Sequence, residues 1–202
     1  MIKLALPGAS VYFLHCTILA CRPRFEPNFL KQRDFMETEF HVIKSIEDAK
    51  ALENVEVGVS DWVVIDQQMI NRFAEATGDY QWIHVDEERA ARELPDGKTI
   101  AHGYMTLSLI PTLTKDFVHV ENLARAINFG CNKVRFYTAV PVGARVRARA
   151  TVLQARKRGG ALHLLSEIKI EVEGERKPAC VAETIGMYFF EEQESEATAQ
   201  TA

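Results

Sequence analysis

The sequence lacks the cysteine pattern of a metal or redox protein. Its four cysteines are scattered along the chain, and no two of them form a C-x-x-C pair. Neither a zinc ribbon nor a redox dithiol is therefore indicated, and reduced thiols in a cytoplasmic protein are the simplest interpretation. The six histidines show no metal-binding spacing, so we expect no metal ion and no other cofactor.

Other absences exclude further classes of protein. The net charge of −4 argues against a general nucleic-acid binder. No phosphate-binding glycine loop, nucleophile elbow, repeat or heptad run is found. The apolar stretch near the N-terminus is interrupted and too short to span a bilayer, so we expect no membrane partner. The chain as a whole is 47% hydrophobic and 26% charged. This composition is typical of one globular domain with a substantial core.

The two ends of the chain differ from its middle. Residues 1–35 carry one early lysine and a broken apolar run that reaches Cys21. They are open to three interpretations: a signal-like segment, a disordered leader, or sequence upstream of a true start at Met36. We favour the last two. Residues 193–202 lack large apolar side chains and are expected to be a disordered tail. The folded domain is then 36–192.

Helical signals dominate the first half of the domain. The second of three short helices has Asp66 as a candidate N-cap, and Gly78 supplies the left-handed residue that stops it. Asp79 then emerges just past its C-terminal end. The three predicted segments are 45–55, 66–79 and 86–93, with Ser45 and Asp86 as the other two caps.

The segment 101–117, "AHGYMTLSLIPTLTKDF", is different. From Tyr104 to Leu113 it holds no charge, and apolar residues occur on every side. Such a pattern predicts a helix that is buried all round. Pro111 is expected to end it or bend it.

Strand signals dominate the second half. Three arginines alternate with small apolar residues over 145–150, which predicts one polar and one covered face. Short turns separate the predicted strands 127–140, 144–158, 161–174 and 179–190. Closely spaced strands favour an antiparallel sheet. The order of elements therefore predicts an α+β fold in which a sheet wraps around a central apolar helix.

Six motifs, in this order along the chain, resemble the MaoC-like, (R)-specific enoyl-CoA hydratase family. The likeness is greatest to its nodulation protein N-like branch, and it implies the hot dog fold. Many of these hydratases carry Asn-Pro where this chain has Gln81-Trp82. The nodulation protein N-like branch also carries Gln-Trp. The difference from Asn-Pro leaves the acyl-chain preference open. The motifs are "FAEATGD" (73–79), "QWIHVD" (81–86), "TIAHGYMTLSLIP" (99–111), "INFGCNKVRF" (127–136), "VPVGARVRA" (140–148) and "KPACVAETIGMYF" (177–189).

The resemblance assigns roles to particular residues. It implies that Asp79 and His84 are the catalytic pair and that Gly103 offers a backbone N–H to the substrate carbonyl. It further implies a homodimer and a thioester substrate carried by coenzyme A or acyl carrier protein. The residue types suit these roles, because a carboxylate and an imidazole can hold one water and move its proton. A helix N-terminus, in turn, presents unpaired N–H groups.

The expected activity is that of a lyase that reversibly adds water to a trans-2-enoyl-CoA and gives the (R)-3-hydroxyacyl-CoA. Two alternatives stay open. Related hot dog proteins are acyl-CoA thioesterases, and a non-catalytic acyl-thioester-binding protein would keep the same fold.

Several other side chains have a structural and a functional interpretation. His102 is expected to make a structural hydrogen bond, or else to line the pocket. The Ser108 hydroxyl can bond back to its own helix or reach the substrate. Trp82 can anchor packing or shape the acyl tunnel. Lys133 and Arg135 are expected on a solvated strand face, with contact to carrier phosphates as the alternative.

Overall fold

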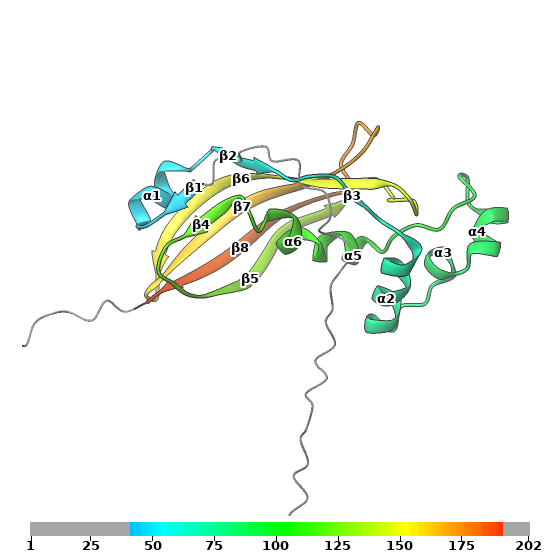
Figure 1. The fold of residues 1–202 in the computed structure, drawn as a ribbon, viewed down its shortest axis with the longest axis horizontal. Coiled ribbons are helices and arrows are strands. Elements are labelled where there is room, and N and C mark those ends of the chain that lie inside the picture. The colour runs from blue at the N-terminus through cyan, green and yellow to red at the C-terminus, as the bar shows by residue number, and fades with distance from the viewer. Residues whose placement is uncertain (1–40, 192–202) are drawn as a thin grey trace, which may run out of the picture. The chain divides into compact units, whose positions relative to one another are not determined.

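The computed structural model describes residues 41–191, so the interpretations of 1–35 and 193–202 lie outside the described residues. Its helices and strands are coloured along the chain in Figure 1. The first half contains β1 (His41–Ile43), α1 (Ile46–Ala51), β2 (Glu56–Val59), β3 (Val63–Val64), α2 (Gln67–Thr77), α3 (Trp82–Val85), α4 (Glu87–Glu93), α5 (Gly103–Ser108) and α6 (Ile110–Thr114). The second half contains β4 (Val118–Val120), β5 (Leu123–Phe136), β6 (Arg145–Arg158), β7 (Ala161–Val172) and β8 (Cys180–Phe190).

One large antiparallel sheet forms the body of the domain. Its strands follow the order β2-β6-β7-β8-β5, with β3 paired to the same strand as β2. All pairings among β5 to β8 are antiparallel, as predicted. The α+β hot dog arrangement is confirmed: α5 and α6 lie against one face of the sheet, while α2 to α4 lie beyond one of its ends (Figure 1).

The predicted helix caps are confirmed. Ser45 and Asp48 form a reciprocal capping box at α1. The Asp66 side chain accepts from the Met69 N–H, and the Asp86 side chain accepts from the Arg89 N–H. Gly78 ends α2 in the left-handed region with φ of 75°, a conformation that costs glycine little. Local chemistry therefore sets where these helices begin and end.

The apolar segment differs from the prediction of one helix buried all round. It forms two short helices that meet at Leu109, because Pro111 lies in the first turn of the second. Met105, Ile110 and Leu113 are buried against the sheet, whereas Tyr104 is 70% exposed. The absence of charge therefore did not mean that this segment is enclosed on every side by its own chain.

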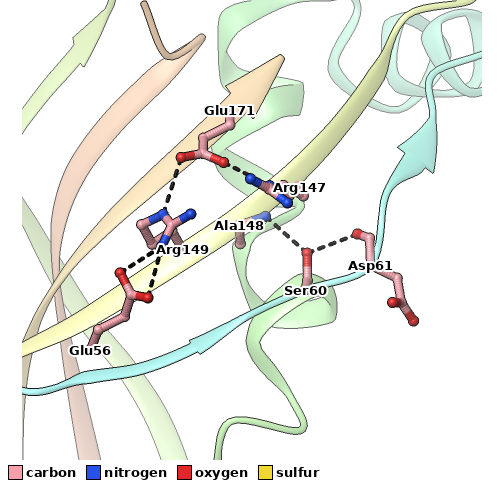
Figure 2. Close-up of polar contacts among 7 residues, drawn as sticks. All are labelled: Glu56, Ser60, Asp61, Arg147, Ala148, Arg149 and Glu171. Atoms are coloured by element: carbon pink, nitrogen blue, oxygen red, sulfur yellow. Dashed lines mark hydrogen bonds and ion pairs between the residues drawn. The ribbon is translucent and has the colours of Figure 1, made fainter. Parts of the chain in front are cut away.

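The two faces of β6 divide as its alternation predicts. Val146, Ala148 and Ala150 point into the core and are at most 2% exposed. On the opposite face, Arg147 and Arg149 both donate to Glu171 of β7 (Figure 2). These cross-strand ion pairs keep the arginines at the surface. No helix among residues 41–191 is long and apolar enough to cross a membrane.

Candidate active site

Asp79 stands in the short connection between α2 and α3. After Gly78, its N–H approaches the Thr77 hydroxyl at 3.4 Å, and its Oδ1 accepts from the Gln81 N–H at 3.3 Å. This Asx-type turn reverses the chain. The second carboxylate oxygen is free of that turn, and the side chain is 55% exposed. Asp79 is thus a turn residue that also presents a carboxylate to its surroundings.

His84 lies on the single helical turn of α3 and is buried. Helical structure begins again at Trp82, four residues after Gly78 has ended α2. The Nδ1 of His84 lies 2.7 Å from the Ile100 carbonyl oxygen. Because a carbonyl only accepts, Nδ1 carries the proton and Nε2 of the neutral ring keeps its lone pair. His84 is therefore fixed in the tautomer that can accept a proton.

His102 joins these two residues from the start of α5. Its Nε2 donates to the backbone carbonyl of Asp79 at 2.9 Å, and lies 3.9 Å from the Asp79 Oδ2. Its ring stacks on that of His84, with centroids 3.7 Å apart and planes inclined by 26°. His102 Nδ1 is buried with no hydrogen-bond partner in the described part of the chain. The predicted structural hydrogen bond thus exists, and it holds the Asp79 turn.

The three side chains form one cluster. One carboxylate oxygen and one nitrogen of each imidazole all lie within 4.8 Å of one another, a span that a single water can bridge. His102, for which the alternative expectation was that it lines the pocket, belongs to this cluster as well. The set is also of the metal-ligating type. However, the two rings are stacked, so their in-plane lone pairs run side by side instead of converging on one ion.

Burial lowers the pKa of His84 below its ordinary value near 6.5. The hydrogen bond to Ile100 and the charge of Asp79 act in the opposite direction, while His102 lowers the pKa further. Desolvation disfavours the charged imidazolium, and a neighbouring imidazolium would repel it. The site therefore favours neutral His84 at physiological pH.

Gly103 is the first residue of α5 and borders the cluster. A Cβ placed there would lie 3.1 Å from the nearest ring atom of Phe136, closer than side chains ordinarily pack. The ring of Phe136 also meets Tyr104 edge to face, 5.8 Å between centroids. Glycine therefore lets the start of α5 approach β5, and it leaves the first N–H groups of the helix uncovered by a side chain of their own.

Two other candidates lie apart from the cluster. The Ser108 hydroxyl donates to the Tyr104 carbonyl at 2.8 Å, which is the back-bonded arrangement of a helical serine. The ring of Trp82 packs under the Arg89 guanidinium of α4, 4.1 Å from ring centroid to charge. Trp82 thus contacts the helical layer, and Ser108 lines a cavity farther along α5.

Sequence reasoning missed a polar clamp behind the cluster. The Gln67 side-chain amide donates to the His84 carbonyl at 2.8 Å and to Asn71 at 2.8 Å. Its oxygen accepts from the hydroxyl of Thr99, which is 1% exposed. Thr99 precedes Ile100, the residue that holds His84 Nδ1. No local pattern marks this contact, because it joins residues that are 32 positions apart.

A cavity of about 850 Å³ lies between α5–α6 and the sheet. It begins at Leu107 and Ser108, roughly one helical turn from Gly103, and continues over the inner faces of β5 to β8. Most of its wall is apolar, including Ile110, Phe117 and Leu164. Such a volume is large enough for a small-molecule ligand.

Characterised proteins similar to this chain are thioester enzymes and nodulation proteins. The chain is 51% identical to 3-hydroxyacyl-thioester dehydratase Z of Mycobacterium tuberculosis over 146 residues, 72% of this chain and 96% of the relative. It is 40% identical to nodulation protein N of Rhizobium meliloti over 148 residues, 72% of this chain and 92% of that protein.

Solved structures with the same fold include a MaoC-like dehydratase from Rhodospirillum rubrum, with a TM-score of 0.53 and 21% identity over 67% of this chain and 91% of that one. The (R)-hydratase of A. caviae has a TM-score of 0.50 and 22% identity over 64% of this chain and 95% of that one. The MaoC-like domain family model matches residues 49–172. This match, together with the 51% identity to the mycobacterial dehydratase, shows that the chain belongs to the MaoC-like domain family.

Proposed function

We propose that this protein is a hydratase/dehydratase that reversibly adds water to a trans-2-enoyl thioester and forms the (R)-3-hydroxyacyl thioester. The observation that carries the proposal is the cluster of Asp79, His84 and His102, in which the Nε2 of His84 is left as a lone-pair acceptor beside a carboxylate. The dehydratase name of the 51%-identical relative supports the reaction class.

The chemistry follows from these positions. A water held between Asp79 and His84 loses a proton to the unprotonated Nε2 of His84 as its oxygen forms a bond to C3. The electrons of the C2–C3 double bond move toward the thioester carbonyl. The Asp79–His84 pair then returns a proton to C2. General acid/base catalysis of this kind contributes about 10²–10⁴-fold in rate.

The enolate-like oxygen needs hydrogen-bond donors. We infer that the N–H of Gly103 supplies one, because it opens α5 and no side chain of its own blocks approach. A preorganised donor of this type is worth about 3–4 kcal/mol in transition-state stabilisation. The apolar cavity that begins at Leu107 and Ser108 would then accept the acyl chain. Neither role needs a metal ion or organic cofactor.

We further infer that two copies pair through β5. This 14-residue edge strand is bonded only on its β8 side among the described residues, and 13 of its residues are exposed, including Ile127 at 44% and Phe129 at 58%. A long apolar edge invites strand pairing. We also propose a cytoplasmic location, which the unpaired thiols of Cys131 and Cys180 favour.

Loss of the enoyl absorbance of crotonyl-CoA tests the reaction. The wild-type protein should consume this substrate, and Asp79→Asn and His84→Gln should each lower kcat by about 10²–10⁴-fold. Asp86→Asn is the matched control, since Asp86 caps α4 two positions beyond His84. A wild type that is inactive on short, medium and long enoyl chains would refute the proposal. Release of free thiol without hydration would instead identify a thioesterase.

A further inference from the structure

The cavity of about 850 Å³ follows β8 away from the catalytic end of the sheet. Phe136, whose ring lies against Gly103, pairs with Cys180 at the start of β8. Gly186 lies farther along the same strand, about 20 Å from Cys180 at ~3.3 Å per residue, and lines the cavity. The lining then continues to Glu191. The cavity therefore extends well past the reach of a short acyl chain.

The ring of Tyr188 lies over Gly186, its neighbour on the inner face of β8. Residues two apart in a strand share a face, and both of these line the cavity. A Cβ at Gly186 would lie 2.8 Å from the Tyr188 Cε2 and 2.9 Å from its hydroxyl oxygen, closer than side chains pack. Because glycine has no Cβ, the ring can lean back along the strand. It is thus held near the sheet and does not stand upright in the cavity.

Packing, and not hydrogen bonding, holds the Tyr188 ring in this position. The side chain is half-buried and packs against the core. Burial raises the pKa of its hydroxyl above the ordinary value near 10, and no other residue within 41–191 hydrogen-bonds to that hydroxyl.

A methyl group at position 186 would displace this ring. The atoms that it would meet belong to the free end of the tyrosine side chain, so the ring moves more easily than the strand. The sheet blocks movement on one side. The ring would therefore rise into the cavity and narrow it at the level of Gly186.

We propose that Gly186 and Tyr188 determine the acyl-chain specificity, because Gly186 keeps the Tyr188 ring against the sheet and so leaves the cavity open to long enoyl chains. This inference rests on the proposed function and deepens it by naming the length of the substrate. An extended carbon chain advances about 1.3 Å per bond, since a C–C bond is about 1.5 Å long, so 20 Å corresponds to about 16 carbons. A chain of that length buries its last methylene groups beside Tyr188, which strengthens its binding.

The kinetic test compares Gly186→Ala with the wild type on two substrates. The chain of trans-2-hexadecenoyl-CoA reaches the Tyr188 ring, whereas that of trans-2-octenoyl-CoA ends short of it. The ratio of kcat/KM for the long substrate to kcat/KM for the short one should fall about tenfold in Gly186→Ala, which corresponds to about two methylene groups left unburied. Use of this ratio cancels any loss of folded enzyme that the substitution causes.

Two further variants isolate the role of the ring. Gly130→Ala is the matched control, because Gly130 lines the same cavity and a Cβ there has no neighbour within 4 Å. It adds the same methyl group without displacing a ring, so it should keep the wild-type ratio. The double variant Gly186→Ala/Tyr188→Ala should have the ratio of Tyr188→Ala alone, because the new methyl group then displaces nothing.

Each of four outcomes would overturn the proposal. A wild type that hydrates trans-2-octenoyl-CoA but not trans-2-hexadecenoyl-CoA does not accept long chains. An unchanged ratio in Gly186→Ala, or an equal fall in Gly130→Ala, would show that the position of the Tyr188 ring does not set chain length. A ratio in the double variant that stays below that of Tyr188→Ala would show that the methyl group acts without the ring.

A binding measurement separates this inference from the proposed reaction. Palmitoyl-CoA and octanoyl-CoA lack the C2–C3 double bond, so neither can be hydrated. In calorimetric titrations below the micelle concentration of palmitoyl-CoA, the wild type should bind palmitoyl-CoA at least about tenfold more tightly than octanoyl-CoA. Gly186→Ala should lose most of that difference.

The two proposals then fail in different ways. Equal affinities of the wild type for palmitoyl-CoA and octanoyl-CoA overturn the chain-length assignment even if enoyl-CoA is hydrated. Tighter binding of palmitoyl-CoA that depends on Gly186, without hydration of any enoyl chain, refutes the reaction and leaves the role of Gly186 and Tyr188 standing.

Discussion

The imidazole rings of His84 and His102 lie face to face, 3.7 Å between centroids, and each ring is hydrogen-bonded to a backbone carbonyl. His84 is held by Ile100, and His102 holds Asp79. The stack therefore fixes both proposed catalytic groups relative to each other. It also places a second titratable ring against the proposed base.

The fall of kcat/KM at acidic pH, the acid limb of the pH profile, should reflect the burial of His84 and its stacking on His102. Burial depresses the pKa of His84 below its ordinary value near 6.5, and His102 depresses it further. The reaction needs the unprotonated ring, so kcat/KM should fall only when the pH drops through this lowered pKa. A profile of kcat/KM from pH 4.5 to 8 should show the acid limb midpoint below 6.5. A midpoint above 6.5 would contradict the assignment of neutral His84 as the proton acceptor.

His102→Phe should move that limb. The phenyl ring keeps the stack and the burial but removes the neighbouring imidazole, whose charge lowers the pKa of His84. The acid limb should therefore shift to higher pH. Loss of the 2.9 Å hydrogen bond to the Asp79 carbonyl should lower kcat by about tenfold, since misplacement of a catalytic group is costly.

His102→Gln is the conservative variant, because its amide can restore the donor to Asp79. Relative to His102→Phe, it should restore part of kcat. The midpoint of the acid limb should not return to its wild-type pH. If His102→Phe lowers the thermal midpoint but leaves the limb in place, His102 acts only in packing.

Features of the fold that depend on residues close together in the sequence were predictable, whereas features that depend on distant segments were not. α2 begins after Asp66 and ends at Gly78 as predicted, because N-caps and left-handed C-caps act within one helical turn. The alternation over β6 likewise predicted its covered face. Exposure of Tyr104 was not predictable from its apolar neighbours, because it depends on what covers α5 from outside its own segment.

The site shows the same division. Asp79 and His84 were identified through the family resemblance. The contacts of His102 with both, and of Gln67 with His84 and Thr99, join positions 16 or more apart. Local patterns carry no information on such contacts, so only the fold could reveal them.

Gly103→Ala separates steric strain from substrate contact. The new methyl would lie 3.1 Å from the ring of Phe136, and overpacking of this kind costs about 1–3 kcal/mol in stability. Phe136→Leu in the same chain should relieve that cost. The methyl would still cover the N–H groups that open α5, so kcat/KM should stay at least about tenfold below the Phe136→Leu parent. Recovery of full activity in the double variant would show that Gly103 serves packing alone.

Gln67→Ala should weaken the support behind His84. Removal of this amide leaves the Thr99 hydroxyl, which is 1% exposed, and the His84 carbonyl without their partner. An unsatisfied buried group costs about 1–3 kcal/mol, so loss of the partner of the Thr99 hydroxyl alone should lower the free energy of unfolding by about that amount in urea titration. Because the clamp sets the position of the His84 turn, kcat should fall as well. Asn71→Ala is the control, since it removes only the exposed end of the same Gln67 contact. If the two variants lose the same stability and activity, the Gln67 amide does not position His84.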